Sequence, residues 1–200
     1  MPHAVPSSRL ALIERIARSA PANPARLRDF IRDYYRGVGE QDLAARTTGE
    51  LAALARLHLD IGSHRRPGKA TVRVFNAAAH AGTGAAAQTI VAIVIDDMPF
   101  LVDSVNMVFA AAGIAVHMIV HPVLQVRRDA RGTLRAAGMQ AAAGTRAESW
   151  QLYLVDRQFD DAHLAALEQS LNDTLADVAV SVRDWRAMRE LMQRLGQGLQ

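Results

Sequence analysis

The sequence contains no cysteine, and this absence excludes several kinds of chemistry at once. Without cysteine the chain has no disulfide, no thiolate nucleophile and no cysteine-ligated zinc or iron–sulfur site. It also lacks an uninterrupted apolar run of about 18 residues, the length that a membrane-spanning helix needs. Charged residues at Arg9, Glu14, Arg15 and Arg18 interrupt the N-terminal apolar positions, unlike the core of a signal peptide. We therefore expect a cytoplasmic protein without a membrane partner.

Lysine and aromatic residues are also scarce, which bears on nucleic-acid binding. Lys69 is the single lysine among 23 basic residues, and the formal net charge is only +3. An RNA-recognition motif needs aromatic residues on its central strands, but the apolar run TIVAIVI at residues 89–95 has none. Trp150 and Tyr153 would lie on opposite faces of one strand, because their separation is odd. Nucleic acid is therefore not an expected partner, although such a binder shares the order of elements predicted below.

Half of the 200 residues are hydrophobic, which is enough for one large core or for a helical segment beside an α/β domain. The first third carries apolar residues at helical spacing over residues 10–17, 27–35 and 48–62. For the third of these helices we expect Thr47 or Thr48 as N-cap and Gly62 at the C-terminal end. Residues 1–66 are therefore predicted to be a helical N-terminal segment.

From Ala70 the periodicity changes to that of strands and helices. Alternation over residues 70–76 predicts a half-exposed strand, and the apolar run at residues 89–95 predicts a buried central strand. A helix is expected next, with Asp97 as N-cap, Pro99 in its first turn and Gly113 at its end. Two stretches rich in Ala and Gly are expected to be flexible connections, Ala77–Gln88 and Ala136–Ala147.

The next segments predict a hairpin. Ile114–Arg128 is extended, with Pro122 forcing an edge or a bulge, and Asp129–Gly132 marks a turn. Ser149–Asp156 is the following strand. A second amphipathic helix spans Leu164 to Val178, with Asp160 or Asp161 available to cap it.

The end of the chain predicts one more strand and one more helix. Val178, Val180 and Val182 alternate, which favours a short last strand, and Asp184 would then cap a terminal helix. The predicted fold is therefore α+β: an N-terminal helical segment, a ferredoxin-like βαββαβ sandwich over residues 67–183 and a C-terminal helix over residues 184–200. Both helices of the sandwich are expected on one sheet face.

Few residues are arranged for chemistry. Asp96 and Asp97 follow the central strand, where they could bind a metal or an amine, or could simply stabilise the helix N-terminus. His117 and His121 are four residues apart, but in an extended segment this separates them by roughly 13 Å, so a shared metal ion is not expected. The sequence has no glycine-rich dinucleotide turn, GxxxxGK[ST], GxSxG or HExxH. We therefore predict no catalytic residue, metal or cofactor in this chain.

Several strings, in order, resemble the N-terminal region of the large bacterial NAD-specific glutamate dehydrogenases, from about residue 25 to the end. They are YYRGVGEQDLAAR (34–46), RRPGKATVRVFN (65–76), DDMPFLVDSV (96–105), HPVLQVRRDARG (121–132), ESWQLYLVDRQ (148–158) and VRDWRAMRE (182–190). The resemblance implies a much longer parent protein that converts L-glutamate to 2-oxoglutarate with NAD, whose catalytic residues and NAD-binding domain lie downstream. It also implies that this chain is an ACT-like regulatory or assembly domain that forms a homo-oligomer.

ACT-like domains elsewhere bind amino acids where the first strand meets the first helix. In this sequence that junction is Asp96, Asp97, Met98, Pro99 and Phe100, which the resemblance implies as an effector site. The sequence departs from the Asp-x-Pro-Gly pattern of amino-acid-binding members, because Phe100 stands where they have glycine. A bulky side chain there is expected to crowd or fill the pocket. A stand-alone amino-acid-binding regulator is the alternative function.

Overall fold

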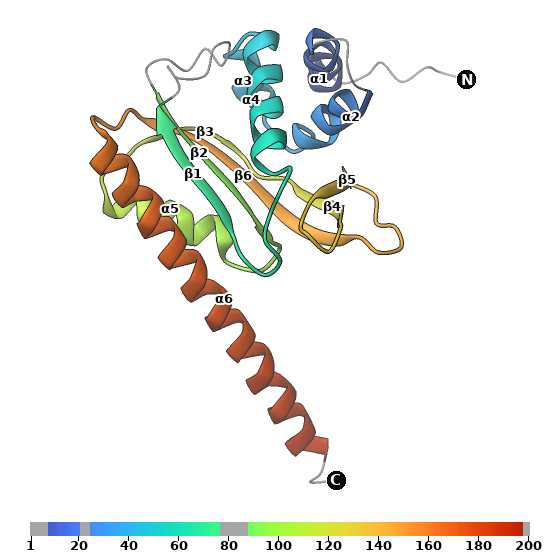
Figure 1. Cartoon of the computed structure of the whole chain (residues 1–200), viewed down its shortest axis with the longest axis vertical. Coiled ribbons are helices and arrows are strands. Elements are labelled where there is room, and N and C mark those ends of the chain that lie inside the picture. The colour runs from blue at the N-terminus through green and yellow to red at the C-terminus, as the bar shows by residue number, and fades with distance from the viewer. Residues whose placement is uncertain (1–7, 21–24, 77–87, 198–200) are drawn as a thin grey trace.

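A computed structural model describes residues 8–20, 25–76 and 88–197 (Figure 1). Within these residues the helices are α1 (Ser8–Ser19), α2 (Ala25–Tyr34), α3 (Glu40–Ala44), α4 (Thr48–Ile61), α5 (Leu101–Ala111) and α6 (Asp161–Gln197). The strands are β1 (Thr71–Asn76), β2 (Gln88–Asp96), β3 (Val116–Val120), β4 (Val123–Arg128), β5 (Leu134–Gly138) and β6 (Arg146–Asp156). The predicted α+β class is confirmed.

All strand pairs in the sheet are antiparallel, in the order β1-β2-β6-β4-β5. The long strand β6 pairs along one side with β2 and along the other with both β3 and β4. Pro122 separates β3 from β4, as predicted, and its carbonyl accepts a hydrogen bond from the Trp150 N–H at 3.0 Å. Because proline has no N–H to donate, the strand breaks here while β6 continues.

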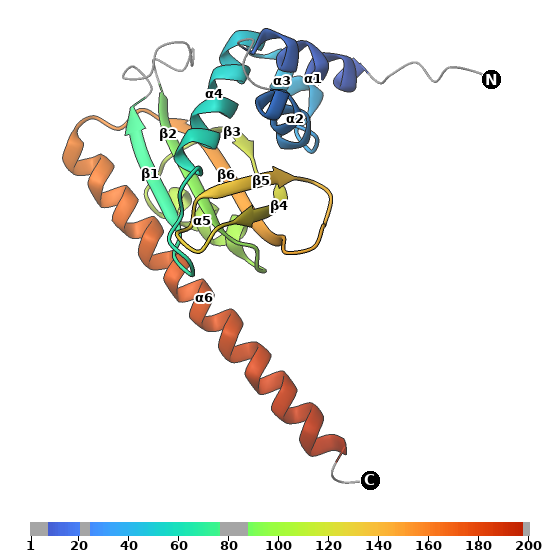
Figure 2. The same ribbon diagram turned by 45° about the vertical axis from the view of Figure 1, so that its right-hand side comes forward.

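The sheet is the middle layer of three (Figures 1 and 2). Helices α1–α4 cover one face, where Ile90, Trp150 and Leu152 join their core. Helices α5 and α6 cover the other face, where Val91, Ile93 and Tyr153 are buried. Since both faces of β2 are covered, its side chains from Thr89 to Ile95 are all buried, which explains the continuous apolar run. Both helices of the predicted sandwich lie on one face, as expected.

Local signals in the sequence set the ends of several elements. Thr47, not Thr48, is the N-cap of α4 and forms a capping box with Glu50. Gly113 follows Ala112, the C-cap of α5, and has φ +65, a conformation that glycine adopts without strain. At α6 the carboxylate of Asp160 accepts a hydrogen bond from the His163 N–H at 2.9 Å. These three predicted termini are confirmed.

His58 joins the helical layer to the sheet. Its ring is fully buried, with Nδ1 2.8 Å from the Tyr34 hydroxyl and Nε2 3.2 Å from the Ile93 carbonyl oxygen. The Trp150 ring packs on His58, with ring centroids 5.1 Å apart. Burial lowers the pKa of His58 to about 3, so the ring is neutral in the folded protein.

The predicted last strand is wrong, as is the separate helix that was expected to begin at Asp184. Residues 161–197 form one helix of 37 residues. The alternation of valines at 178, 180 and 182 is part of a longer helical pattern, because Leu171, Leu175, Val178 and Val182 continue at steps of four, three and four residues. Leu171, Leu175 and Val182 are buried, whereas Val180 is 46% exposed.

The predicted connection at Ala136–Ala147 is wrong at its two ends, whereas residues 139–145 between them do connect β5 to β6. It contains most of β5 and the start of β6, and Val126 of β4 pairs with Ala137. Small residues were mistaken for a loop, although here they lie in an edge strand close to α2. The Met139 N–H donates to the Asp33 carboxylate at 3.0 Å. Of the other predicted connection, residues 77–87 lie outside the described part, and Gln88 belongs to β2.

Strand β1 occupies the edge of the sheet beside β2, antiparallel to it. In a βαββαβ sandwich the last strand would take this place. The order of elements therefore differs from the prediction, although the architecture is compatible with an ACT-like fold. In the described residues, no helix combines the length and apolar character needed to cross a membrane. The proposed domain boundaries stay a prediction.

Candidate functional site

The five residues predicted to form an effector site lie where β2 ends and α5 begins. Asp96 is the last residue of β2 and pairs with Glu148 in the register of the sheet. The backbone of the next residue is still hydrogen-bonded to β6, because the Asp97 N–H donates to the Ala147 carbonyl at 3.0 Å. Helix α5 then starts at Leu101, so the prediction of Asp97 as N-cap and Pro99 in the first turn is wrong. Residues 97–100 therefore lie between the end of β2 and the start of α5.

Phe100 is the N-cap of α5 and has no side-chain capping hydrogen bond. Its φ of 72 places it in the left-handed region, the conformation that favours glycine. The side chain is 66% exposed, so it does not fill a pocket at the junction, contrary to the expectation from sequence. Phe100 thus adopts a backbone conformation suited to the glycine of the Asp-x-Pro-Gly pattern while its ring points away from the core.

The two aspartates at the junction have different environments. The Asp96 carboxylate forms a salt bridge with the buried guanidinium of Arg65. The Asp97 side chain is exposed and has no hydrogen bond or ion pair to any residue that the structure describes. Partial desolvation at the junction raises the pKa of Asp97. Asp97 is therefore the carboxylate available to a ligand, whereas Asp96 is already neutralised.

Arg65 connects the junction to a buried ionic network that sequence reasoning missed. Glu148, 1% exposed, accepts two hydrogen bonds each from Arg65 and Arg128, at 2.8 to 3.2 Å, and one from Trp150 Nε1 at 3.3 Å. Arg128 Nη1 also donates to the carbonyls of Gly62 and Gly132. The sequence signal was a glutamate at the start of a buried strand, which is rare without a charged partner.

A second polar chain lies on the α5/α6 face of the sheet. Tyr153 Oη donates to Gln151 Oε1 at 2.8 Å, and Gln151 Nε2 donates to Ser149 Oγ at 3.0 Å. Burial, followed by the negative charge of Asp103 in the first turn of α5, raises the pKa of Tyr153. Because Ser149 lies opposite Ile95 in the sheet, this chain runs from the middle of the sheet toward the junction.

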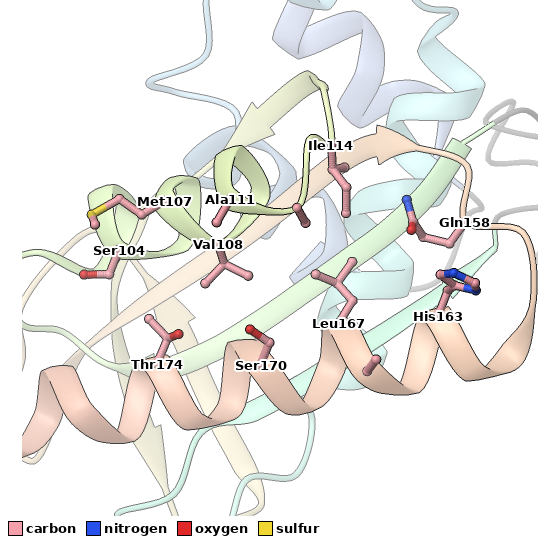
Figure 3. Close-up of a pocket in the computed structure, with 12 residues that line it drawn as sticks. Ser104, Met107, Val108, Ala111, Ile114, Gln158, His163, Leu167, Ser170 and Thr174 are labelled. Atoms are coloured by element: carbon pink, nitrogen blue, oxygen red, sulfur yellow. The ribbon is translucent and has the colours of Figure 1, made fainter.

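A groove of about 610 Å³ lies between α5 and α6 (Figure 3). Its walls are apolar or small, with Met107, Val108 and Ala111 on α5 facing Leu167 and Ser170 on α6. Gln158 and His163 close one end, and Ser104 and Thr174 lie at the other. No charged carboxylate or guanidinium lines it, so it suits apolar side chains better than a free amino acid.

His117 and His121 make separate contacts. His117 Nε2 lies 2.8 Å from the Asp156 carboxylate, and His121 lines a small cavity of about 150 Å³ with Tyr34 and Asp42. The Ala115 N–H and His117 lower the pKa of Asp156. Among the described residues, no group of three His, Asp or Glu side chains is placed to hold a metal ion.

Comparison with known proteins places most of the chain in one family. The model of the family described as "Glutamate dehydrogenase, ACT1 domain" matches residues 30–171. An NAD-specific glutamate dehydrogenase of Pseudomonas aeruginosa is 34% identical over 131 residues, 62% of this chain and 8% of its own length. One from Halomonas elongata is 34% identical over 164 residues, which are 80% of this chain and 10% of the relative. One from Mycobacterium tuberculosis is 29% identical over 177 residues, which are 82% of this chain and 10% of the relative. The chain thus spans about a tenth of these relatives.

Proposed function

Since this chain belongs to the glutamate dehydrogenase ACT1 domain family, we propose that it is the non-catalytic N-terminal regulatory and assembly domain of a cytoplasmic NAD-dependent glutamate dehydrogenase. The parent reaction converts L-glutamate, NAD and water to 2-oxoglutarate, ammonia and NADH. In this proposal the downstream domains bind NAD and carry out the chemistry. This chain contributes an effector site and contacts for assembly. We therefore expect the purified chain to produce no NADH from glutamate and NAD.

The β2–α5 junction carries the regulatory part of the proposal. An amino acid brings an ammonium group and a carboxylate, and the junction offers a match for each. The Asp97 carboxylate attracts the ammonium group, since no described residue neutralises it. The first N–H groups of α5 have no side-chain cap and attract the carboxylate, with help from the helix dipole. The first hydrogen bond within the helix is that of the Ser104 N–H to the Phe100 carbonyl.

Isothermal titration of the chain with a panel of amino acids, including glutamate, aspartate and arginine, tests this site. We expect one amino acid to bind saturably, and Asp97→Asn to weaken its binding at least about tenfold, because a charge-assisted contact contributes about 1.5–3 kcal/mol. Asp60→Asn, on the exposed end of α4 across the sheet, is the matched control and should bind normally. Absence of binding across the panel would remove the effector role and leave only assembly.

In the full-length enzyme the same variant separates regulation from catalysis. Asp97→Asn should leave kcat and KM for glutamate and NAD unchanged without effector, and should raise the effector concentration needed for half-maximal response. A loss of basal activity in this variant, with the domain still folded, would mean that the junction takes part in catalysis.

A further inference from the structure

A cavity of about 220 Å³ lies where the loop between α4 and β1 meets β4 and β6. The loop runs beside the β4–β5 turn (Figure 2), where the Arg65 N–H donates to the Gly132 carbonyl at 3.0 Å. Three arginines from three segments line the cavity, Arg65 from the loop, Arg128 from β4 and Arg146 from β6. We call it the arginine cavity. None of the residues 96–100 at the β2–α5 junction lines it.

The register of the sheet places Arg146 beside the buried ionic network. Arg146 and Glu148 are two residues apart on β6, so their side chains lie on the same face of the sheet. Val126 of β4 pairs with Arg146 and belongs to the core that the sheet shares with α1–α4. The side chain of Arg146 is exposed and makes no hydrogen bond or ion pair with any residue that the structure describes. A complete guanidinium is therefore available at this cavity.

The two buried arginines also keep one donor each. A guanidinium has five N–H groups. Arg65 uses four of them, toward two carboxylates and one backbone carbonyl. Arg128 also uses four, toward Glu148 and two backbone carbonyls. Each arginine thus leaves one Nη–H without a partner among the described residues, although the two side chains are only 3% and 10% exposed. A buried donor that lines a cavity is available to an acceptor placed there.

The carboxylates around the arginine cavity are already engaged. Glu148 accepts hydrogen bonds from both buried arginines. Asp96 forms a salt bridge with Arg65. Asp129 accepts from an exposed arginine and from two backbone N–H groups. Among the described residues, the positive charge of Arg146 therefore has no counterion at this cavity. A small anion would balance this charge while its oxygens accept the donors that the three guanidiniums have left.

We propose that the arginine cavity binds the phosphate group of a small anion. Its three guanidiniums come from three segments and approach a ligand from different sides, which suits a tetrahedral oxyanion. A planar carboxylate needs only one bidentate arginine. Arg146 offers a bidentate pair of donors, and Arg65 and Arg128 offer one donor each. This site goes beyond the proposed effector site, because it lies on the sheet face opposite α5 and needs no ammonium group in its ligand.

Titration calorimetry of the 200-residue chain with inorganic phosphate, at an ionic strength fixed with chloride, tests the site. We expect saturable binding, and Arg146→Gln should raise the phosphate dissociation constant at least about tenfold, because it removes charge-assisted hydrogen bonds. Since Arg146 is exposed, the variant should fold normally. Arg127→Gln is the matched control and should bind phosphate normally, because Arg127 is an exposed arginine of β4 that does not line the cavity. Equal effects of the two substitutions would overturn the proposal.

Ribose 5-phosphate distinguishes free phosphate from the phosphate group of a larger molecule. Tighter binding of the ester would identify a phosphorylated metabolite as the ligand, and tighter binding of inorganic phosphate would identify the free ion. Either result supports the site when Arg146→Gln weakens the binding. If neither compound binds, the proposal is wrong. Malonate tests the geometry, because a dicarboxylate that binds as tightly as phosphate would overturn the assignment of a tetrahedral ligand.

Amide chemical shifts measured by NMR locate the bound phosphate. We expect the largest shifts at Gly132 and Gly144, which line the arginine cavity. Largest shifts in the first turn of α5, which begins at Leu101, would place the anion at the uncapped helix N-terminus and overturn the proposal. The variant Asp97→Asn should bind phosphate as the wild type does. Failure of the effector site and failure of the arginine cavity are therefore separate results.

Discussion

Glu148→Gln removes the one fully buried carboxylate of the ionic network while keeping its shape. The wild-type side chain accepts hydrogen bonds from Arg65, Arg128 and Trp150. Arg65 is 3% exposed and the Arg128 side chain 10%, so neither guanidinium gains much water when its counterion is lost. Only the half-exposed Asp96 remains as a charged partner for Arg65.

The expected cost of this substitution is large. Breaking a buried ion pair by removing one partner costs about 3–5 kcal/mol, since the other charge is left buried. Urea unfolding followed by tryptophan fluorescence should therefore give a free energy of unfolding about 3–5 kcal/mol lower, and the Tm should fall by roughly 10 °C. Tryptophan fluorescence reports on this region, because Trp150 contacts the substituted side chain.

Glu14→Gln provides a control of the same chemistry at the surface. Glu14 also accepts two hydrogen bonds from one arginine, Arg32, at 2.8 and 2.9 Å, but both side chains are about 40% exposed. Solvent screens this pair, and we expect a cost below about 1 kcal/mol. If Glu148→Gln proves as mild as Glu14→Gln, water reaches the network in solution and its burial does not hold the layers together.

Three further predictions concern single residues. His58→Gln should flatten the acid side of the profile of stability against pH. The pKa of His58 is about 3 in the folded protein, below its unfolded value, so its contribution to wild-type stability is complete above about pH 6.5. The free energy of unfolding of the wild type, measured with urea, should therefore fall by about 2 kcal/mol between pH 6.5 and 5, and that of the variant should not. Gly62→Ala should lower the free energy of unfolding by about 1–3 kcal/mol and alter the near-ultraviolet circular dichroism, because the new Cβ would lie 2.2 Å from the Trp150 ring. Gly49→Ala on the same helix is the control, since a Cβ there meets open space, and it should be neutral or stabilising. Phe100→Gly should be about 1 kcal/mol more stable than Phe100→Ala in thermal unfolding, since only glycine adopts the left-handed conformation without cost; equal stabilities would contradict this.

The sequence predicted those parts of the fold in which local pattern and tertiary structure agree. The run at residues 89–95 is the central strand because both of its faces are covered, and Thr47, Gly113 and Asp160 mark element ends. Prediction failed at Val178–Val182, where alternation and helical spacing coincide in the same residues. Three valines favour a strand, but they follow seventeen residues of uninterrupted helix with no glycine or proline to end it.

From sequence the candidate site is only a position where a strand meets a helix, and its chemistry depends on contacts distant in sequence. Nothing near Asp96 indicates that it pairs with Arg65, 31 residues earlier, while its neighbour Asp97 does not. Glu148 is 83 residues from Arg65, and the connection arises only when the sheet is assembled. Periodicity gives the elements but not these pairings, so the distinction between an occupied and an available carboxylate required the structure.

The position of β1 explains why α6 can leave the sheet. Strand β2 needs a neighbour on the side away from β6, and in a βαββαβ chain the segment after the second helix must turn back to supply it. Here β1 pairs with β2 over six residues, and the α6 side chain of Glu168 accepts a hydrogen bond from the Val74 N–H on the outer edge of β1. With β1 in this position, the place beside β2 that a returning strand would take is already filled. The residues after Val178 therefore continue the helix, along which Val182 is still buried and Met188 is 60% exposed.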